Sequence, residues 1–312
     1  MNHRVATITL NPALDLVGYC AEVEWGEINR VTTTGLHPAG KGINVARVLK
    51  DLGIDVTAGG LLGKENQNGF QRLFDELGII NRFQMVRGRN RVNVKLTDKE
   101  GAVTELNFSG FNVTADDWQR FTTDSLTWLG QFDMVCISGS LPAGINPDAF
   151  TDWMSKLRIL CPYIIFDSSH ETLAAGLKAL PWMIKPNRQE VEMWAGRQLS
   201  SLEELIRVAH QLCAQGIVHV VISLGAEGAL WINASGGWIA RPPSCEVVST
   251  VGAGDSMVGG LIYGLLMRES SEYTFRLATA VAALAVSQAN VGIRDHTQLA
   301  MMMPQIELEP VY

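Results

Sequence analysis

The feature that most constrains the fold is a regular alternation of helices and apolar strands in the middle of the chain. Between the expected helices at 114–129, 147–160, 171–180 and 202–215 stand MVCIS, YIIFD and WMIK, and VHVVISL follows the last helix. These short segments are apolar on both faces, whereas a half-exposed strand alternates apolar with polar residues. Strands of this kind, interleaved with helices, are typical of a parallel sheet covered on both faces. The pattern predicts an α/β fold in three layers.

The first part of the chain repeats this pattern with two interruptions. RVATITL at 4–10 predicts a buried strand, and the apolar spacing over 44–52 predicts a helix. The segments at about 19–36 and 91–108 instead alternate roughly, and the second contains a turn, KEG, at 99–101 that predicts a hairpin. We expect these two segments to form a small separate sheet. Its exposed face would need a ligand or a second subunit to cover it.

Composition narrows the class of protein. Of the 312 residues, 47% are hydrophobic and 18% charged, so the chain can bury a large core, and we expect a single domain over 1–312. The net charge of −7 and the absence of a basic run argue against nucleic-acid binding. The five cysteines are scattered, as is typical of reduced core residues in a cytosolic protein. The N-terminus has no apolar signal region, and the longest apolar run, at 278–286, is too short to span a bilayer. We therefore expect a cytoplasmic protein that does not bind membranes.

A glycine-rich segment that opens an apolar run, STVGAGDSMVGG at 249–260, suggests chemistry at a helix N-terminus. Gly252, Ala253 and Gly254 let backbone N–H groups crowd around a ligand, and a helix N-terminus favours an anion. Asp255 is itself an anion at that place. The two fit together if the ligand is a transferring phosphoryl group and Asp255 accepts a proton beside it. The structural alternative is tight packing with an acidic residue that caps the helix.

A second glycine-rich segment, GLHPAGKG at 35–42, is one residue short of a P-loop. Gly42 stands where the P-loop needs the hydroxyl that binds magnesium, and the segment does not follow a central strand. We therefore interpret Gly40 and Gly42 as positions of close backbone approach to a ligand, with Lys41 as a point charge. Asn44 begins the next expected helix, where its structural role would be an N-cap.

Two further motifs follow expected strands. In KPNRQE at 185–190, Asn187 and Glu190 have the spacing of a capping box, but they could also hold Mg²⁺ directly or through water. SLGAEG at 223–228 is either an ordinary turn or a contact to nucleotide phosphates through Ser223 and the backbone. Ligands of open α/β sheets bind at the carboxyl ends of the strands, which favours the functional interpretations.

Polar groups follow two more strands. Asp15 in NPALD either bonds its own turn or binds sugar hydroxyls, and Ser138 and Ser140 in SGSLPAG offer hydroxyl groups. Each signal is weak alone, but together they place small or polar residues after five or six separate strands. This convergence predicts one crevice.

AGKGINVA at 39–46 and STVGAGDS at 249–256 resemble the two signature motifs of the ribokinase-like sugar kinases, also called the PfkB family. KPNRQE is similar to that family's N-x-x-E motif and SLGAEG to its nucleotide-binding turn. The resemblance runs essentially from end to end and in the expected order. TLNPALD, TGLHPAGKGINVA, RVNVKL and SGSLPAG narrow it to the kinases of that family that act on phosphosugars.

The resemblance implies a ribokinase-like fold with a small β lid, formed mainly by about 19–36 and 91–108, that pairs two subunits into a homodimer. It implies ATP and Mg²⁺ as cofactors and the phosphorylation of fructose 1-phosphate to fructose 1,6-bisphosphate with release of ADP. Tagatose 6-phosphate and fructose 6-phosphate are alternative substrates. Kinases of the family that act on fructose 6-phosphate carry glycine where Lys41 stands, so Lys41 favours fructose 1-phosphate. A sugar-phosphate-binding regulator that has lost catalysis is the alternative from another class.

The resemblance also implies roles for individual residues. Asp255 would be the base, and the N–H groups of Gly252, Ala253 and Gly254 would stabilise charge on the transferred phosphoryl group. The sugar phosphate would be bound by Asp15, Gly40, Lys41, Asn44, Arg91 and Ser140, with Lys41 and Arg91 on its phosphate. The nucleotide site would be lined by Ser223, Leu224, Gly225, Ala226, Glu227 and Gly228, with Asn187 and Gly254. Glu190 and Asn187 would organise Mg²⁺, through water.

Overall fold

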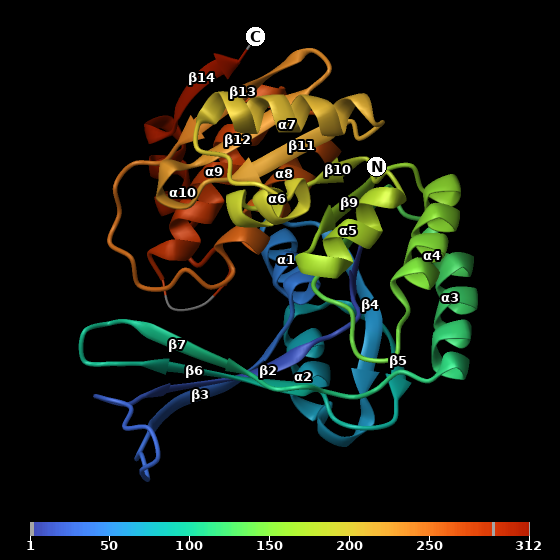
Figure 1. Ribbon diagram of the computed structural model, residues 1–312, viewed down its shortest axis with the longest axis vertical. Coiled ribbons are helices and arrows are strands. Elements are labelled where there is room, and N and C mark those ends of the chain that lie inside the picture. Colours follow the sequence, from blue (N-terminus) through green and yellow to red (C-terminus); the bar gives the residue numbers. More distant parts are fainter. Residues whose placement is uncertain (1–2, 289–290, 312) are drawn as a thin grey trace.

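The computed structural model describes residues 3–288 and 291–311, and a ten-stranded sheet forms the body of the molecule (Figure 1). The strand order is β14-β13-β12-β11-β10-β9-β8-β1-β4-β5. The strands are β1 (Arg4–Thr9), β4 (Asp55–Gly63), β5 (Ile80–Val86), β8 (Met134–Ser138), β9 (Ile164–Asp167), β10 (Met183–Ile184), β11 (His219–Ser223), β12 (Ala229–Asn233), β13 (Gly236–Arg241) and β14 (Glu307–Val311). All pairings from β5 to β11 are parallel, and those from β11 to β14 are antiparallel. The mainly parallel sheet is thus confirmed, with an antiparallel extension that the sequence did not predict.

Helices cover both faces of this sheet. They are α1 (Lys41–Asp51), α2 (Asn68–Leu77), α3 (Ala115–Leu129), α4 (Pro147–Leu160), α5 (His170–Lys178), α6 (Arg188–Ala195), α7 (Leu202–Ala214), α8 (Ala253–Leu266), α9 (Ser271–Val286) and α10 (His296–Met302). The core on one face draws side chains from α3 to α7, and the core on the other face from α1, α2, α8, α9 and α10. In β9, Ile164 and Phe166 join the first core and Ile165 joins the second. The three-layer prediction is therefore confirmed.

None of the helices in the described part of the chain is both long and apolar enough to cross a bilayer.

The four helices predicted at 114–129, 147–160, 171–180 and 202–215 correspond to α3, α4, α5 and α7, whose ends lie within two residues of the predicted ones. The helices α9 and α10 were not predicted, and α1 begins earlier than predicted. It starts at Lys41, and Gly40 is its N-cap residue. The prediction that Asn44 caps this helix is wrong, because Asn44 lies inside the first turns. The sequence K-G-I-N-V has little intrinsic helix preference at its start, and the helix forms there because α1 packs closely on β1. A Cβ at Gly42 would lie 2.5 Å from Thr9 Oγ1, so only glycine fits.

A four-stranded sheet projects from the body and forms the lid (Figure 1), with the order β3-β2-β6-β7. Its strands are β2 (Ala13–Tyr19), β3 (Thr32–Ala39), β6 (Arg91–Thr97) and β7 (Val103–Asn107). The hairpin around residues 99–101 is confirmed as the antiparallel pair β6–β7. The first predicted lid segment, 19–36, was misplaced, because most of residues 20–31 lie in turns or irregular backbone and β2 begins at Ala13. Asp15 accordingly lies within a strand, and its interpretation as a turn residue is wrong.

Candidate active site

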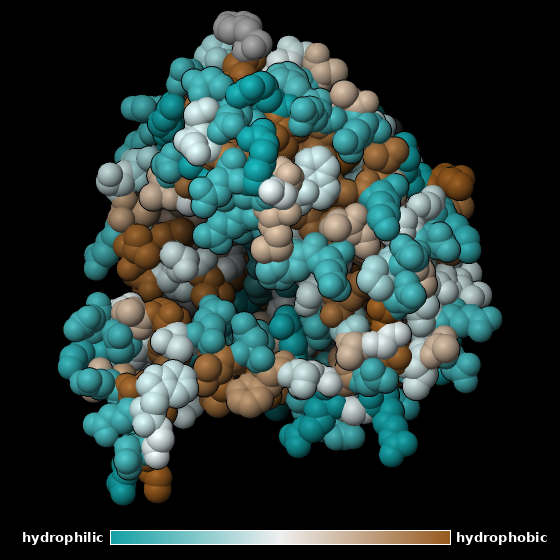
Figure 2. Space-filling model, viewed as in Figure 1, coloured by the Kyte–Doolittle hydropathy of each residue, from teal (hydrophilic) through white to brown (hydrophobic). Residues whose placement is uncertain are grey.

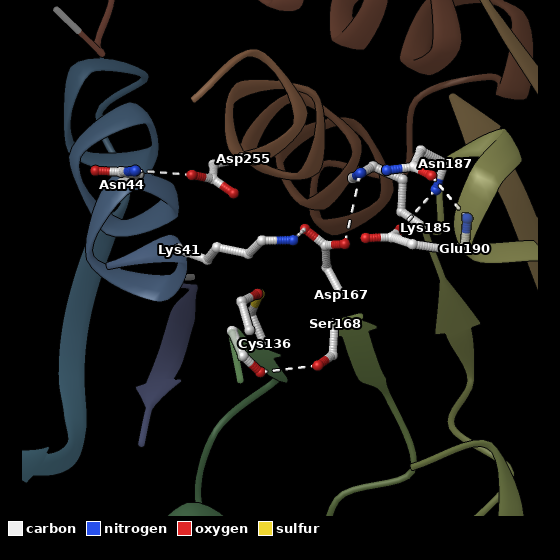
Figure 3. A network of polar contacts seen from close by, with 11 residues as sticks. Lys41, Asn44, Cys136, Asp167, Ser168, Lys185, Asn187, Glu190 and Asp255 are labelled. Atoms are coloured by element: carbon white, nitrogen blue, oxygen red, sulfur yellow. Dashed lines mark hydrogen bonds and ion pairs between the residues drawn. The ribbon is translucent and has the colours of Figure 1, made fainter. Parts of the chain in front are cut away.

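The predicted site residues gather where the lid faces the carboxyl ends of the parallel strands. β1, β8, β9, β10 and β11 run in the same direction, so their carboxyl ends share one edge of the sheet. In the space-filling view a hollow opens between the body and the lid (Figure 2). The close-up shows charged side chains from α1, from the end of β9, from the segment after β10 and from α8 turned toward one another (Figure 3). The prediction of a single crevice is confirmed only in part, because the cavity under the lid and the pocket beside the SLGAEG turn share no lining residue.

The glycine-rich segment before α8 forms the N-terminus of that helix, as predicted. Gly252 is the N-cap residue with φ of 77°, a left-handed conformation that favours glycine. The Ala253 N–H makes only a long bond of 3.4 Å, to the carbonyl oxygen of Thr250. A Cβ at Gly254 would lie 3.2 Å from Lys185 Nζ, so the ammonium group stands directly beside the first turn. The positive end of the helix dipole and this cation together make the position attractive to an anion.

Asp255 projects from the first turn of α8 and is only 6% exposed. Its Oδ2 accepts a hydrogen bond of 2.7 Å from Asn44 Nδ2 on α1. Burial raises the pKa of Asp255, whereas the positive charge of Lys41 and the bond from Asn44 oppose that rise. Asn44 therefore holds and tunes a buried carboxylate. A carboxylate with a raised pKa binds a proton more readily than an exposed one, as a general base must.

Two lysines share the carboxylate of Asp167 at the end of β9. Lys41 Nζ lies 3.4 Å from Oδ2, and Lys185 Nζ lies 3.5 Å from Oδ1 (Figure 3). The side chains of Asp167 and Lys185 are 1% and 5% exposed, so this pair interacts with little screening by water, whereas Lys41, at 37%, is partly screened. Burial alone would lower the pKa of Lys41, but Asp167, Asp255 and Glu190 raise it above its ordinary value. Lys41 therefore stays charged at neutral pH.

Asp167 and Lys185 were missed in the sequence analysis. The available signal was a charged residue closing each of two strands predicted to be buried, YIIFD and WMIK. A charge at such a place is costly unless it is paired, so the two residues could have been matched with each other.

Asn187 and Glu190 form the capping box at the start of α6. Asn187 Oδ1 accepts from the Glu190 N–H at 2.9 Å, and Glu190 Oε2 accepts from the Asn187 N–H at 2.8 Å. The structural interpretation of these residues is thus confirmed. Burial raises the pKa of Glu190, and the nearby carboxylate of Asp167 raises it further. Because the carboxylates of Glu190 and Asp167 repel each other, a divalent cation bound between them would be stabilised by both.

Oxygen donors of this kind fit Mg²⁺. Asp167 Oδ1 is buried and makes no hydrogen bond within the described residues, its neighbour being the ammonium group of Lys185, and the Glu190 carboxylate points toward Asp167 (Figure 3). No group of three or more His, Cys, Asp or Glu side chains in the described ranges could hold a metal ion by itself. Mg²⁺ commonly binds through one or two carboxylates together with substrate phosphates and water, so the sparse donor set suits it.

Asp15 is held between two lid residues that the sequence analysis missed. Its Oδ2 lies 2.6 Å from Lys95 Nζ, and its Oδ1 accepts from Asn93 Nδ2 at 3.0 Å. The parallel pairing of β2 with β6 sets Asp15 opposite Asn93 and brings Lys95 onto the same face. A cavity of about 410 Å³ between the lid and the body is lined in part by Asp15, Lys95, Asn44 and Val251. It is large enough for a hexose phosphate.

Arg91 and Ser140 come together through Asn11, which the sequence analysis also missed. Arg91 Nε donates to the Asn11 carbonyl oxygen at 3.2 Å, and Asn11 Nδ2 donates to Ser140 Oγ at 3.1 Å. Burial lowers the pKa of Arg91 and the charge of Asp15 opposes this, but the group stays protonated at neutral pH. Gly40, predicted as a ligand contact, packs against the body, because a Cβ there would lie 2.9 Å from Thr9 Cγ2.

The SLGAEG segment lies against a separate pocket of about 720 Å³. Leu224, Ala226 and Glu227 line it, together with residues that the sequence did not single out: Arg188, Ser200, Leu202, Ile239, Arg241, Pro242, Pro243, Ser244, Gln305 and Glu307. Ser223 instead anchors the turn, because its N–H donates to the Pro186 carbonyl oxygen at 3.0 Å and so joins the two motifs. Gly225 begins a short 3-10 helix, and a Cβ at Gly228 would clash with the Ala240 carbonyl oxygen.

Comparisons with known proteins agree with this geometry. The model of the pfkB family carbohydrate kinases matches residues 8–298. A 1-phosphofructokinase of Escherichia coli (strain K12) is 73% identical over 310 residues, covering 99% of both chains, and one of Haemophilus influenzae is 51% identical over 305 residues, covering 97% of both. A crystal structure described as that of a "Possible 1-phosphofructokinase" from Thermotoga maritima matches with a TM-score of 0.85 at 25% identity, covering 99% of this chain and 100% of that one.

The buried pair of Asp15 and Lys95 yields a stability prediction. Lys95→Met leaves a carboxylate buried without its cation and should lower the free energy of unfolding by about 3 kcal/mol. The double variant Asp15→Asn/Lys95→Met should recover more than half of that loss. Urea unfolding measures both. Lys99→Met is the control, because its ion pair with Glu22 is exposed, and it should change stability little. A loss for Lys95→Met no larger than that of the control would contradict the assignment.

Proposed function

We propose, since the chain belongs to the pfkB family of carbohydrate kinases, that it catalyses the ATP-dependent phosphorylation of fructose 1-phosphate to fructose 1,6-bisphosphate. It is a phosphotransferase that uses an alcohol group as acceptor, and ADP is the second product. The observation that carries the proposal is the buried carboxylate of Asp255, held by Asn44 beside the positive end of α8 and close to two lysines. Phosphoryl transfer needs this combination of a proton acceptor and preorganised positive charge.

Asp255 would accept the proton of the sugar hydroxyl that attacks the γ-phosphoryl group of ATP. Burial raises the proton affinity of its carboxylate, and the bond from Asn44 fixes one oxygen so that the other can face the acceptor. The oxygen of the hydroxyl then bonds to phosphorus as the bond to the β-phosphate oxygen breaks. Because Asn44 contacts Asp255 and lines the cavity under the lid, we propose that it binds the sugar as well.

Positive charge around the transferred group would come from the backbone and from Lys185. The N–H groups of Gly252, Ala253 and Gly254 open α8, and Lys185 Nζ stands beside Gly254. Donors that are fixed before the reaction stabilise the charge that develops on the phosphoryl oxygens at no cost of reorganisation. Lys185 is thereby added to the residues proposed from the sequence.

ATP is proposed to occupy the pocket beside the SLGAEG turn, with its phosphates directed toward Asn187 and Gly254. Leu224, Ala226 and Glu227 of the turn Ser223 to Gly228 form one wall, and Arg188 Nη2 lies 3.4 Å from Glu227 Oε2. Mg²⁺, when bound, would neutralise charge on the nucleotide phosphates. Asp167 Oδ1 and Glu190 would hold it, with Asn187 contributing through water.

The sugar phosphate is proposed to lie in the cavity under the lid. Asp15 would accept hydrogen bonds from sugar hydroxyls, and the backbone at Gly40 would border them. Arg91, Ser140 and Lys41 would bind the phosphate that the substrate already carries. Lys41 pairs with Asp167 in the structure, and a substrate phosphate would compete for its ammonium group.

The lid supports a proposed homodimer of single kinase domains, each spanning residues 1–312. Three apolar side chains on or next to the lid strands are largely exposed: Leu36 at 55%, Val103 at 51% and Phe108 at 57%. The lid of a second subunit would cover them.

An ADP-release assay tests the proposed function directly. Fructose 1-phosphate, fructose 6-phosphate and tagatose 6-phosphate are compared at equal ATP and Mg²⁺, and the expected result is the highest kcat/KM for fructose 1-phosphate. Asp255→Asn, purified in the same way, controls for contaminating kinases. A tenfold preference for another ketose phosphate would overturn the substrate, and no ADP release with any of them would indicate a regulator without catalysis.

Glu190→Gln separates the metal role from the capping role. Glutamine also serves in a capping box, so the thermal midpoint of unfolding should change little. The loss of a carboxylate should raise the Mg²⁺ concentration for half-maximal rate about tenfold. Titration of activity with Mg²⁺ measures this. An unchanged Mg²⁺ dependence would leave Glu190 with the capping role alone.

Lys41→Ala tests the phosphate contact. The loss of a hydrogen bond to a charged group costs about 1.5–3 kcal/mol, so the KM for fructose 1-phosphate should rise roughly tenfold or more while that for ATP stays nearly the same. Lys50→Ala, on the same helix but paired with Asp55 away from the site, is the control. If the KM for ATP rose and that for the sugar did not, the two substrates would be wrongly placed.

A further inference from the structure

A third polar cavity lies behind the proposed sugar site. It measures about 680 Å³ and is bounded by β3, α1, α2 and the segment 291–294. It shares His37, Pro38, Arg47 and Val291 with the cavity under the lid, so these residues form a common wall. None of the residues proposed to bind ATP or the sugar phosphate lines it.

Three arginines from different segments converge on this cavity. Arg47 of α1 is half-buried, whereas Arg72 of α2 and Arg294 are exposed. Desolvation lowers the pKa of Arg47, and the nearby charge of Arg294 lowers it further, although Asp51 and Glu76 oppose this. The guanidinium groups of Arg47 and Arg294 therefore repel each other in this cavity, and a bound anion would relieve the repulsion.

The carboxylates of the cavity do not neutralise these arginines directly. Within residues 3–288 and 291–311, neither Asp51 nor Glu76 lies within ion-pair distance of any of the three guanidinium groups. Asp51 Oδ2 instead accepts from the Ile293 N–H at 2.7 Å. Arg47 Nη1 makes only a long bond of 3.4 Å, to the Val291 carbonyl oxygen. The arginine donors therefore remain available.

We propose that this cavity is a second binding site, for a small molecule that carries a phosphate group. Arginine forks match phosphate oxygens in geometry and charge. The lining carries Arg47, Arg72 and Arg294 against Asp51 and Glu76, a net charge of +1, whereas the whole chain carries −7, so the cavity favours anions locally. The volume exceeds what orthophosphate needs and accommodates a sugar phosphate or a nucleotide.

The site adjoins catalytic elements without containing catalytic residues. Val291 packs directly against Gly252, the N-cap residue of α8, and leaves no room for a Cβ there. Arg47 lies on α1 within one turn of Asn44. In the described ranges no hydrogen bond or ion pair joins the exposed Arg72 or Arg294 to Asn44 or Asp255, so replacing these arginines should leave the basal reaction unchanged.

Equilibrium dialysis with radiolabelled orthophosphate tests the site in the absence of turnover. The double variant Arg72→Gln/Arg294→Gln should bind the phosphate of this cavity about tenfold more weakly than the unmodified protein. The control Arg158→Gln/Arg207→Gln removes the same charge from exposed positions on α4 and α7 and should bind like the unmodified protein. Both double variants should keep their kcat and both KM values.

Lys41→Ala distinguishes phosphate bound at the active site from phosphate bound in the cavity. This variant should bind phosphate more weakly at the active site and equally well in the cavity. Competition by a sugar phosphate or by a non-hydrolysable ATP analogue then identifies the ligand class, and displacement by either supports the proposal. Three results would overturn it: unchanged binding by Arg72→Gln/Arg294→Gln, complete loss of binding in Lys41→Ala, or displacement by neither competitor at millimolar concentration, which indicates an adventitious ion only. Since phosphate binding is measured by dialysis in the absence of turnover, these binding results are independent of the proposed kinase reaction.

Discussion

The site depends on one buried carboxylate, that of Asp167, which holds two ammonium groups in place. Lys41 reaches it from α1 and Lys185 from the segment after β10, so the interaction joins the two ends of the crevice. Without Asp167 the two lysines would repel each other, and Lys185 would be a buried charge without a counterion. Burial raises the pKa values of Asp255 and Glu190, and the positive charge of both lysines opposes that rise. The charges of the proposed proton acceptor Asp255, the proposed metal ligands Asp167 and Glu190, and the two lysines therefore depend on one another.

The centre of the sheet was predictable because its strands are apolar on both faces, and this pattern can be recognised in one sequence without knowledge of the fold. The antiparallel strands β12 to β14 were not predicted. β14 pairs with β13 across about seventy residues of chain, and no local pattern reports such a pairing. The start of α1 was missed for a different reason, because its glycines lower the local preference for a helix and tertiary packing against Thr9 compensates.

The candidate site was predictable where one short segment of sequence contains both the glycines that shape the backbone and the side chain that reacts, as at Gly252 to Asp255. It was not predictable where a role depends on a partner from elsewhere in the fold. Asn44 has the spacing of a helix cap, yet its amide bonds a carboxylate 211 residues away. Lys95 lies in RVNVKL and Asn11 in TLNPALD, but these segments do not show which residues the two side chains contact. Only the lid register and the ends of the strands bring them to Asp15 and Ser140. The individual roles of the site residues remain proposals.

The most direct test of this account is the pH dependence of kcat/KM for fructose 1-phosphate. Asp255 must be ionised to accept a proton, so activity should fall as the pH drops through its raised pKa. Asn44→Leu removes a hydrogen bond to the charged form and should move this acidic limb up by about one pH unit or more. Asp255→Asn should abolish the limb and lower kcat by about 10²–10⁴-fold. An acidic limb that stays in place in Asn44→Leu, together with near-normal turnover in Asp255→Asn, would contradict the account.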